Sequence, residues 1–173
     1  MDILLPEYKQ MLLLLVKHDV NFMLIGGYAV IYHGYERSTT DMDIWLQPDN
    51  NNRDKLILAL SEFGIGHENL DLLAQKDFNE ITFFYFGERP RRIDFLTRIN
   101  GVIFDEAEKE VQSFPFENVQ IPIIQYYHLI RSKISNNRPQ DKADVEMLQK
   151  IHAQTTENKD NSVLSFLKRL FKI

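Results

Sequence analysis

The chain has no cysteine among its 173 residues and no long hydrophobic run. Without cysteine, a disulfide framework and a thiolate-bound zinc site are both excluded. The longest apolar run, residues 11–16, is far shorter than the ~20 residues that a membrane-spanning helix needs, so we expect no membrane span. No charged and then apolar N-terminal stretch leads to a small-residue cleavage site. We therefore expect a cytoplasmic protein.

The chain also lacks an excess of positive charge, since its formal net charge is -5. Proteins that coat nucleic acid non-specifically depend on surplus lysine and arginine, so this class is disfavoured. A nucleic-acid substrate would need a local basic patch. With 44% hydrophobic residues, the chain is able to bury the core of one globular domain.

Hydrophobic periodicity predicts a mixed α/β (α+β) fold, with a small mixed sheet flanked by helices and further helices toward the C-terminus. The expected helices span residues 3–18, 28–33, 50–63 and 124–151, the last interrupted at residues 136–140. The expected strands span residues 22–25, 41–46, 80–86 and 92–97, and the last two should pair as an antiparallel hairpin.

We expect residues 1–153 to form the domain, residues 154–162 a polar linker and residues 163–173 a basic amphipathic helix. Such a helix either packs on its own domain or on a second subunit, or it touches a membrane surface or nucleic acid.

Asp41 and Asp43 are two residues apart in a predicted strand, so their carboxylates leave the same face of the sheet. Paired carboxylate oxygens suit Mg²⁺, which typically takes one or two carboxylates together with phosphates and water. The alternative is a solvated strand face, because short motifs often match by chance.

Gly26 and Gly27 directly follow a predicted strand and open a short helix. Backbone N–H groups and the helix dipole are able to hold phosphate at such a place, and glycine lets the backbone approach the ligand. A tight strand-to-helix turn without a ligand explains the same pair.

Asp94 alternates with Ile93 and Phe95 in another predicted strand, where a lone aspartate usually faces solvent. If this strand lies beside residues 41–46, Asp94 joins Asp41 and Asp43. Three neighbouring anions repel one another unless a cation neutralises them, which favours a metal.

These residues resemble a known family. The stretch Leu24-Ile25-Gly26-Gly27, thirteen further residues and then Asp41-Met42-Asp43-Ile44 is similar to the hG[GS]-x(9–13)-Dh[DE]h signature of the nucleotidyltransferase (DNA polymerase β-like) superfamily. The lead-in to Asp41, with Arg37 and Thr39-Thr40, resembles minimal prokaryotic nucleotidyltransferases, including those of toxin–antitoxin and abortive-infection systems. The resemblance covers residues 20–150 and implies a nucleotidyltransferase fold.

The resemblance also implies the roles of individual residues. Asp41, Asp43 and Asp94 would be catalytic and would bind two Mg²⁺ ions. A nucleoside triphosphate would be the substrate, bound by Gly26, Gly27, Arg37, Thr40 and Lys133. For Arg37 and Lys133, ordinary surface salt bridges are the alternative.

Lys133, Arg138, Asp141 and Asp144 resemble the K-x(n)-R-x-K-D-x-x-D stretch in the C-terminal helices of these proteins. The sequence departs from that pattern at Pro139-Gln140, where a lysine commonly precedes the aspartate. The aromatic pairs Phe83-Phe84 and Tyr126-Tyr127 are expected to lie in the core rather than to stack on bases.

Two functions remain open from the sequence. The first is a Mg²⁺-dependent nucleotidyltransferase that moves a nucleoside monophosphate to a hydroxyl of a small molecule, a protein or a tRNA. The second is a non-catalytic module of the same fold, antitoxin-like or regulatory, with a partner protein or a second copy of the chain as its binding partner.

Overall fold

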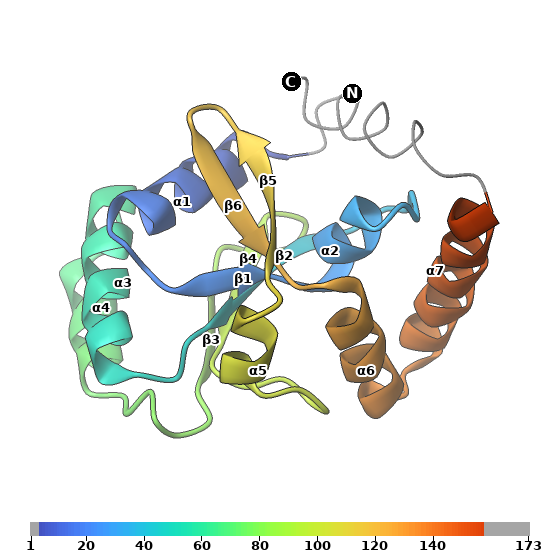
Figure 1. Ribbon diagram of the computed structural model, residues 1–173. Coiled ribbons are helices and arrows are strands. Elements are labelled where there is room, and N and C mark those ends of the chain that lie inside the picture. The colour runs from blue at the N-terminus through green and yellow to red at the C-terminus, as the bar shows by residue number, and fades with distance from the viewer. Residues whose placement is uncertain (1–3, 158–173) are drawn as a thin grey trace.

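The computed structural model describes residues 4–157, which form a six-stranded mixed sheet with helices around it (Figure 1). The mixed α/β class is therefore confirmed. The helices are α1 (Pro6–Lys17), α2 (Gly26–Tyr32), α3 (Asn50–Phe63), α4 (His67–Ala74), α5 (Phe104–Glu108), α6 (Tyr126–Asn136) and α7 (Pro139–Glu157). The strands are β1 (Phe22–Leu24), β2 (Asp41–Leu46), β3 (Phe83–Phe86), β4 (Arg92–Leu96), β5 (Gln112–Phe116) and β6 (Val119–Ile123).

The order of the strands across the sheet is β3-β4-β2-β1-β6-β5. Strands β2 and β4 run parallel, as do β1 and β6, whereas the remaining neighbours are antiparallel. The predicted hairpin of β3 and β4 is confirmed, and β4 lies directly beside β2. This neighbourhood brings the predicted carboxylates together.

Helices α1, α3 and α4 gather on one side of the sheet in Figure 1, and α2, α6 and α7 lie on the other. The start of α3 is stabilised by Asp49, whose side chain accepts hydrogen bonds from the backbone N–H groups of Asn51 and Asn52. The helix ends, as predicted, at Gly64, which has a left-handed conformation with φ of +101°. Trp45 and Phe95, on the neighbouring strands β2 and β4, are fully buried in the core.

Several elements were not predicted from the sequence: α4, α5 and the hairpin of β5 and β6. Helix α5 has only five residues, too few to show a helical period. Strands β5 and β6 contain Pro115 and Pro122, and proline argues against a strand because it lacks the N–H group that the ladder uses. Helix α2 begins at Gly26, two residues earlier than expected.

Helix α7 runs to Glu157 and so continues into residues 154–162, which were predicted to be a linker. The rest of that range and the predicted amphipathic helix at residues 163–173 lie outside the described residues. Within residues 4–157, no helix is long and apolar enough to cross a lipid bilayer.

Candidate active site

The parallel pairing of β2 and β4 places Asp43 directly opposite Asp94. Asp41 lies two residues before Asp43, on the same face of β2, and pairs with Arg92 of β4. Asp94 is buried, with an exposed fraction of 5%. The three carboxylates therefore share one face of the sheet, as expected if the two strands were neighbours.

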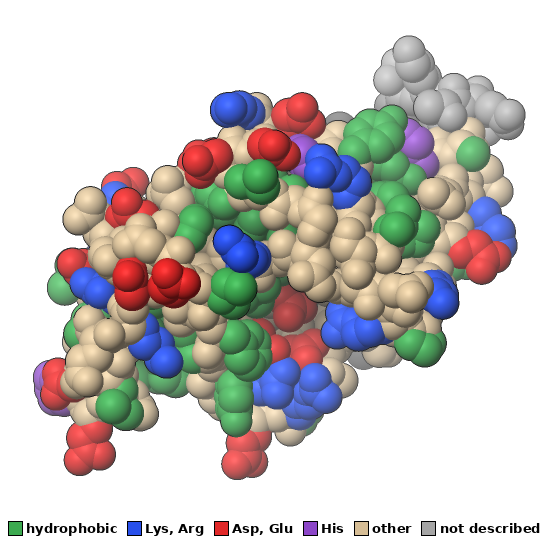
Figure 2. All heavy atoms as spheres, turned by 90° about the horizontal axis from the view of Figure 1, so that it is seen from below, with side chains coloured by type: hydrophobic (Ala, Val, Ile, Leu, Met, Phe, Trp, Pro, Cys, Tyr) green, Lys and Arg blue, Asp and Glu red, His purple; other side chains and the backbone are tan. Residues whose placement is uncertain are grey.

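All eight site residues predicted from the sequence line a single cavity of about 460 Å³. They are Gly26, Gly27, Arg37, Thr40, Asp41, Asp43, Asp94 and Lys133. A second cavity, of about 620 Å³, adjoins the first and shares Gly26, Asp43 and Asp94 with it. Figure 2 shows acidic side chains at the bottom of a hollow whose rim carries basic and hydrophobic side chains.

Gly26 and Gly27, here called the glycine turn, are required by close packing. Gly26 has a left-handed φ of +61°, and a Cβ atom placed on it would lie 1.8 Å from Oδ2 of Asp43. A Cβ atom on Gly27 would lie 2.2 Å from Oγ1 of Thr39. Any side chain at either position would displace the groups that line the cavity.

Two arginines that we did not predict compensate the carboxylates. The guanidinium of Arg92 donates a hydrogen bond of 2.6 Å to Oδ2 of Asp94 and lies 3.8 Å from Oδ2 of Asp41. Arg89 donates a hydrogen bond of 3.1 Å to the same oxygen of Asp41. Arg92 precedes Asp94 by two residues on one strand, so strand alternation predicts that both side chains lie on the same face. Arg89 lies in the turn before β4, where no periodic pattern predicts the direction of a side chain.

The pKa of Asp43 is raised to about 6, chiefly because the carboxylate is removed from water and also because Asp41 and Asp94 are negative. Lys133 and Arg138 act in the opposite direction, since their positive charges favour the ionised form. The carboxylate of Asp43 is therefore acted on by two negative neighbours, Asp41 and Asp94, and by the positive side chains of Lys133 and Arg138.

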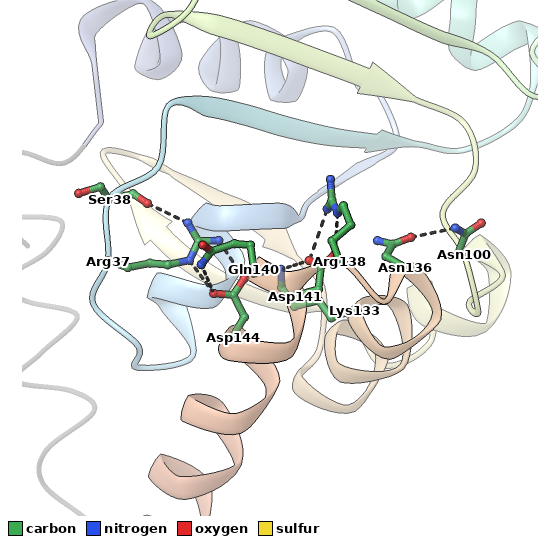
Figure 3. Close-up of polar contacts among 9 residues, drawn as sticks. All are labelled: Arg37, Ser38, Asn100, Lys133, Asn136, Arg138, Gln140, Asp141 and Asp144. Carbon is green, nitrogen blue, oxygen red and sulfur yellow. Dashed lines mark hydrogen bonds and ion pairs between the residues drawn. The ribbon is translucent and has the colours of Figure 1, made fainter.

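A cluster of charged side chains joins α6, α7 and the loop before β2 (Figure 3). We call it the charge network, and its members are Arg37, Lys133, Arg138, Asp141 and Asp144. Figure 3 shows Lys133 reaching from α6 to Asp141 of α7 and Arg37 reaching from its loop to Asp144. Lys133 lies 3.0 Å from Asp141 and 2.7 Å from Asp144.

Burial makes these ion pairs different from the surface salt bridges that were the alternative for Lys133. The exposed fractions of Asp141 and Asp144 are 1% and 0%, and that of Lys133 is 5%. Although burial alone would raise their pKa values, the pKa values of Asp141 and Asp144 are lowered by hydrogen bonds from Arg138, Lys133 and Arg37. The network therefore holds two carboxylates ionised inside the protein, and a surface role for Lys133 is wrong.

The carboxylates of Asp41, Asp43 and Asp94 offer oxygen ligands for a hard cation, but they do not form a complete metal site by themselves. Within residues 4–157, no three acidic or histidine side chains are arranged as a ready-made metal site, and Arg92 is bonded to Asp94. However, Oδ1 of Asp94 is buried without a hydrogen-bond partner. Mg²⁺ needs only one or two carboxylates beside phosphate and water, so Asp41, Asp43 and this oxygen are suitable ligands.

The aromatic pairs do not all lie in the core. Phe84 and Tyr126 pack against the core as expected. Phe83 and Tyr127 are exposed, so the expectation was wrong for these two rings. In a strand, successive side chains point to opposite faces, which explains why Phe83 and Phe84 differ.

Comparisons with known proteins do not assign the chain to a family. No family model matches the sequence, and no curated protein matches it. Its function is therefore inferred from the site.

Proposed function

We propose that the chain is a Mg²⁺-dependent nucleotidyltransferase with a nucleotidyltransferase fold. It would transfer a nucleoside monophosphate from a nucleoside triphosphate to a hydroxyl group of a small molecule, a protein or a tRNA. The observation that carries the proposal is the pairing of Asp43 with Asp94 on adjacent parallel strands. With Asp41 on the same face, these carboxylates lie where two cavities meet.

The smaller cavity suits the triphosphate. Its wall includes the backbone of the glycine turn and the exposed side chain of Thr40, both able to hydrogen-bond phosphate oxygens. Lys133 and Arg138 also line it, and both lower the pKa of Asp43, so their positive charge is felt inside the cavity. Arg37 donates two hydrogen bonds to Asp144, so we assign Arg37 a structural role: it fixes the loop that forms one wall of the cavity.

The reaction would form a bond between the acceptor oxygen and the α-phosphorus. The bond from that phosphorus to the bridging oxygen would break, and pyrophosphate would leave with the electron pair. Asp94 would take the hydroxyl proton, because its Oδ1 has no other hydrogen-bond partner. Mg²⁺ held by Asp41 and Asp43 would supply positive charge for the triphosphate and the leaving pyrophosphate, while Oδ1 of Asp94 accepts the proton.

A second candidate is a non-catalytic module, antitoxin-like or regulatory. It is favoured by one observation: Arg89 and Arg92 already compensate Asp41 and Asp94 within the chain. A protein that uses this site for binding alone needs no metal to keep the carboxylates together. The two candidates differ in whether nucleotide is consumed.

A transfer assay separates the two candidates. The purified protein is incubated with MgCl₂ and each labelled nucleoside triphosphate in turn, with and without total tRNA, and label transfer and pyrophosphate release are measured. We compare Asp43→Asn with Asp71→Asn, a matched change at an exposed aspartate on α4. Transfer should fall about 100-fold or more in Asp43→Asn, since a metal ligand is lost, and should be unchanged in Asp71→Asn.

Transfer that survives in Asp43→Asn would contradict the assignment of this carboxylate. If no triphosphate is consumed under any condition, while partner binding is the same in the wild type, Asp41→Asn and Asp43→Asn, the non-catalytic module replaces the enzyme.

A further inference from the structure

Strand β3 forms one edge of the sheet and presents two aromatic rings on the face that carries the carboxylates. Tyr85 pairs with Asp94 and Phe83 pairs with Leu96 in the antiparallel ladder of β3 and β4. Residues paired in this way project to the same face, so both rings lie on the side of Asp94. Their exposed fractions are 53% for Phe83 and 54% for Tyr85. We call this pair the aromatic shelf.

The aromatic shelf and the glycine turn lie on opposite sides of the carboxylates. The strand order is β3-β4-β2-β1, and the glycine turn follows β1. Phe83 lines the larger cavity, which also reaches Asp43 and Asp94 but not the loop with Thr40. If the triphosphate occupies the smaller cavity, Phe83 borders the space left for the acceptor, and Tyr85 follows it along the edge of the sheet.

Arg92 and Arg98 lie beside the aromatic shelf, and two more arginines lie in the turn between β3 and β4. Arg92 lies over the ring of Tyr85, with its guanidinium carbon 4.9 Å from the ring centre. Arg98 is exposed and lines the larger cavity, and Arg89 and Arg91 are exposed in the turn between β3 and β4. The ion pair of Arg91 with Glu7 is solvent-exposed, and such pairs contribute little stability, so breaking it to bind a phosphate would cost little. The chain is acidic overall, so this basic rim is a local feature.

We infer that the aromatic shelf stacks the bases at the end of a single-stranded nucleic acid, which would present its terminal hydroxyl to Asp94 as the acceptor. The centres of the two rings are 6.2 Å apart and their planes are tilted by 43°, so each ring offers a separate face to a base. A mononucleotide would occupy one ring only. Base–aromatic stacking is tolerant of sequence, and a basic rim that follows the backbone is its usual companion.

An edge strand is also a place where a protein strand can add. Arg98, which lines the larger cavity with Phe83, and Arg91, whose pair with Glu7 is solvent-exposed, favour the nucleic acid, because backbone pairing with a protein strand makes no use of positive side chains. Pairing of β3 with a strand of another protein chain is the alternative outcome that the experiment distinguishes.

Binding is measured by the fluorescence anisotropy of a short labelled single-stranded oligoribonucleotide, with its duplex as a second probe and no triphosphate present. Phe83→Ala and Tyr85→Ala remove one ring each, whereas Phe83→Tyr and Tyr85→Phe keep a ring. Leu72→Ala is the control for lost apolar surface, since Leu72 is 62% exposed on α4. Circular dichroism checks that each variant is folded.

We expect each alanine variant to bind the single strand about five-fold more weakly or worse, and each ring-keeping variant to bind like the wild type. The duplex should bind more weakly than the single strand, and Leu72→Ala should have no effect. Equal binding by all variants would overturn the inference. It would also be overturned if the alanine variants only dissociated a dimer in size-exclusion chromatography, because the strand edge would then be an interface between copies.

The inference rests on the proposed function for the role of acceptor, but the two fail separately. If binding depends on the two rings but no nucleotide is transferred, the enzymatic function is rejected and the role of the aromatic shelf in binding is retained. If nucleotide is transferred to another acceptor and the oligonucleotide does not bind, the enzymatic function is retained and the role of the aromatic shelf in binding nucleic acid is rejected.

Discussion

Arg37 and Asp144 are joined by two hydrogen bonds, of 2.7 and 2.9 Å, although 107 residues separate them in the sequence. Arg37 belongs to the loop that leads into β2, and Asp144 lies on α7. Asp144 also accepts a hydrogen bond from Lys133 of α6. Through this one carboxylate, two helices hold the loop that forms a wall of the smaller cavity.

Asp144→Ala should destabilise the protein by about 3–5 kcal/mol, because it leaves the buried ammonium of Lys133 with one partner fewer and releases Arg37. Urea unfolding measures the change in the free energy of unfolding. Glu146→Gln on the same helix is the control, since its pair with Lys150 is exposed, and it should change little. Similar unfolding midpoints for the two variants would show that the charge network adds no stability.

The contribution of Asp43 to stability should fall as the pH rises from about 4 to 6, because the pKa of Asp43 is about 6 in the folded protein and 3.8 ordinarily. In this range the folded state keeps a proton that the unfolded chain has lost. Asp43→Asn removes this loss, so at pH 7 it should be more stable than the wild type by about 1–3 kcal/mol. Urea unfolding of both proteins across this range gives the difference.

Asp141 and Asp144 do not obscure this comparison. Their pKa values are lowered below the ordinary 3.8, so most of their contribution to stability is present above that pH and is lost in stronger acid. A difference between the wild type and Asp43→Asn that does not change with pH would contradict the raised pKa of Asp43.

Adding MgCl₂ should raise the melting temperature of the wild type, since a ligand that binds only the folded state stabilises it by about 2.7 kcal/mol at a hundred-fold excess over Kd. The rise should be lost in Asp43→Asn and kept in Asp71→Asn. Removing the metal with EDTA should restore the original melting temperature. This measurement needs no acceptor, so it tests the metal site independently of transfer. An equal rise in both variants would place the binding elsewhere.

Gly26→Ala should reduce both stability and nucleotide binding, because the new Cβ would overlap Asp43 in addition to the strain of a left-handed residue. The strain alone costs about 1–2 kcal/mol. Gly64→Ala is the matched control: its φ is +101°, but no atom lies within 4 Å of the added Cβ. Urea unfolding and equilibrium binding of a labelled triphosphate in MgCl₂ compare the two. Equal loss in both variants would mean that the contact with Asp43 is unimportant.

Local sequence patterns predicted the helices and strands that have a clear period or a clear end. Helix α3 was predicted with its bounds, because its apolar spacing is helical and Gly64 stops it. The β5–β6 hairpin was missed, because Pro115 and Pro122 oppose the strand pattern, although the two strands pair with each other over five residues. Its place beside β1, which pairs with β6 at Leu24 and Ile123, is a tertiary interaction that a local pattern does not contain.

The sequence by itself determined which groups are available at the site: the carboxylates of Asp41 and Asp43 on one strand face and the glycine turn upstream. Only the tertiary structure decided that β4 lies beside β2, so that Asp94 meets Asp43. It also decided that Lys133 is buried between two carboxylates and that Phe83 is exposed at the sheet edge. The physical reason is that spacing fixes the direction of side chains along one element, whereas burial and charge pairing depend on which elements pack together.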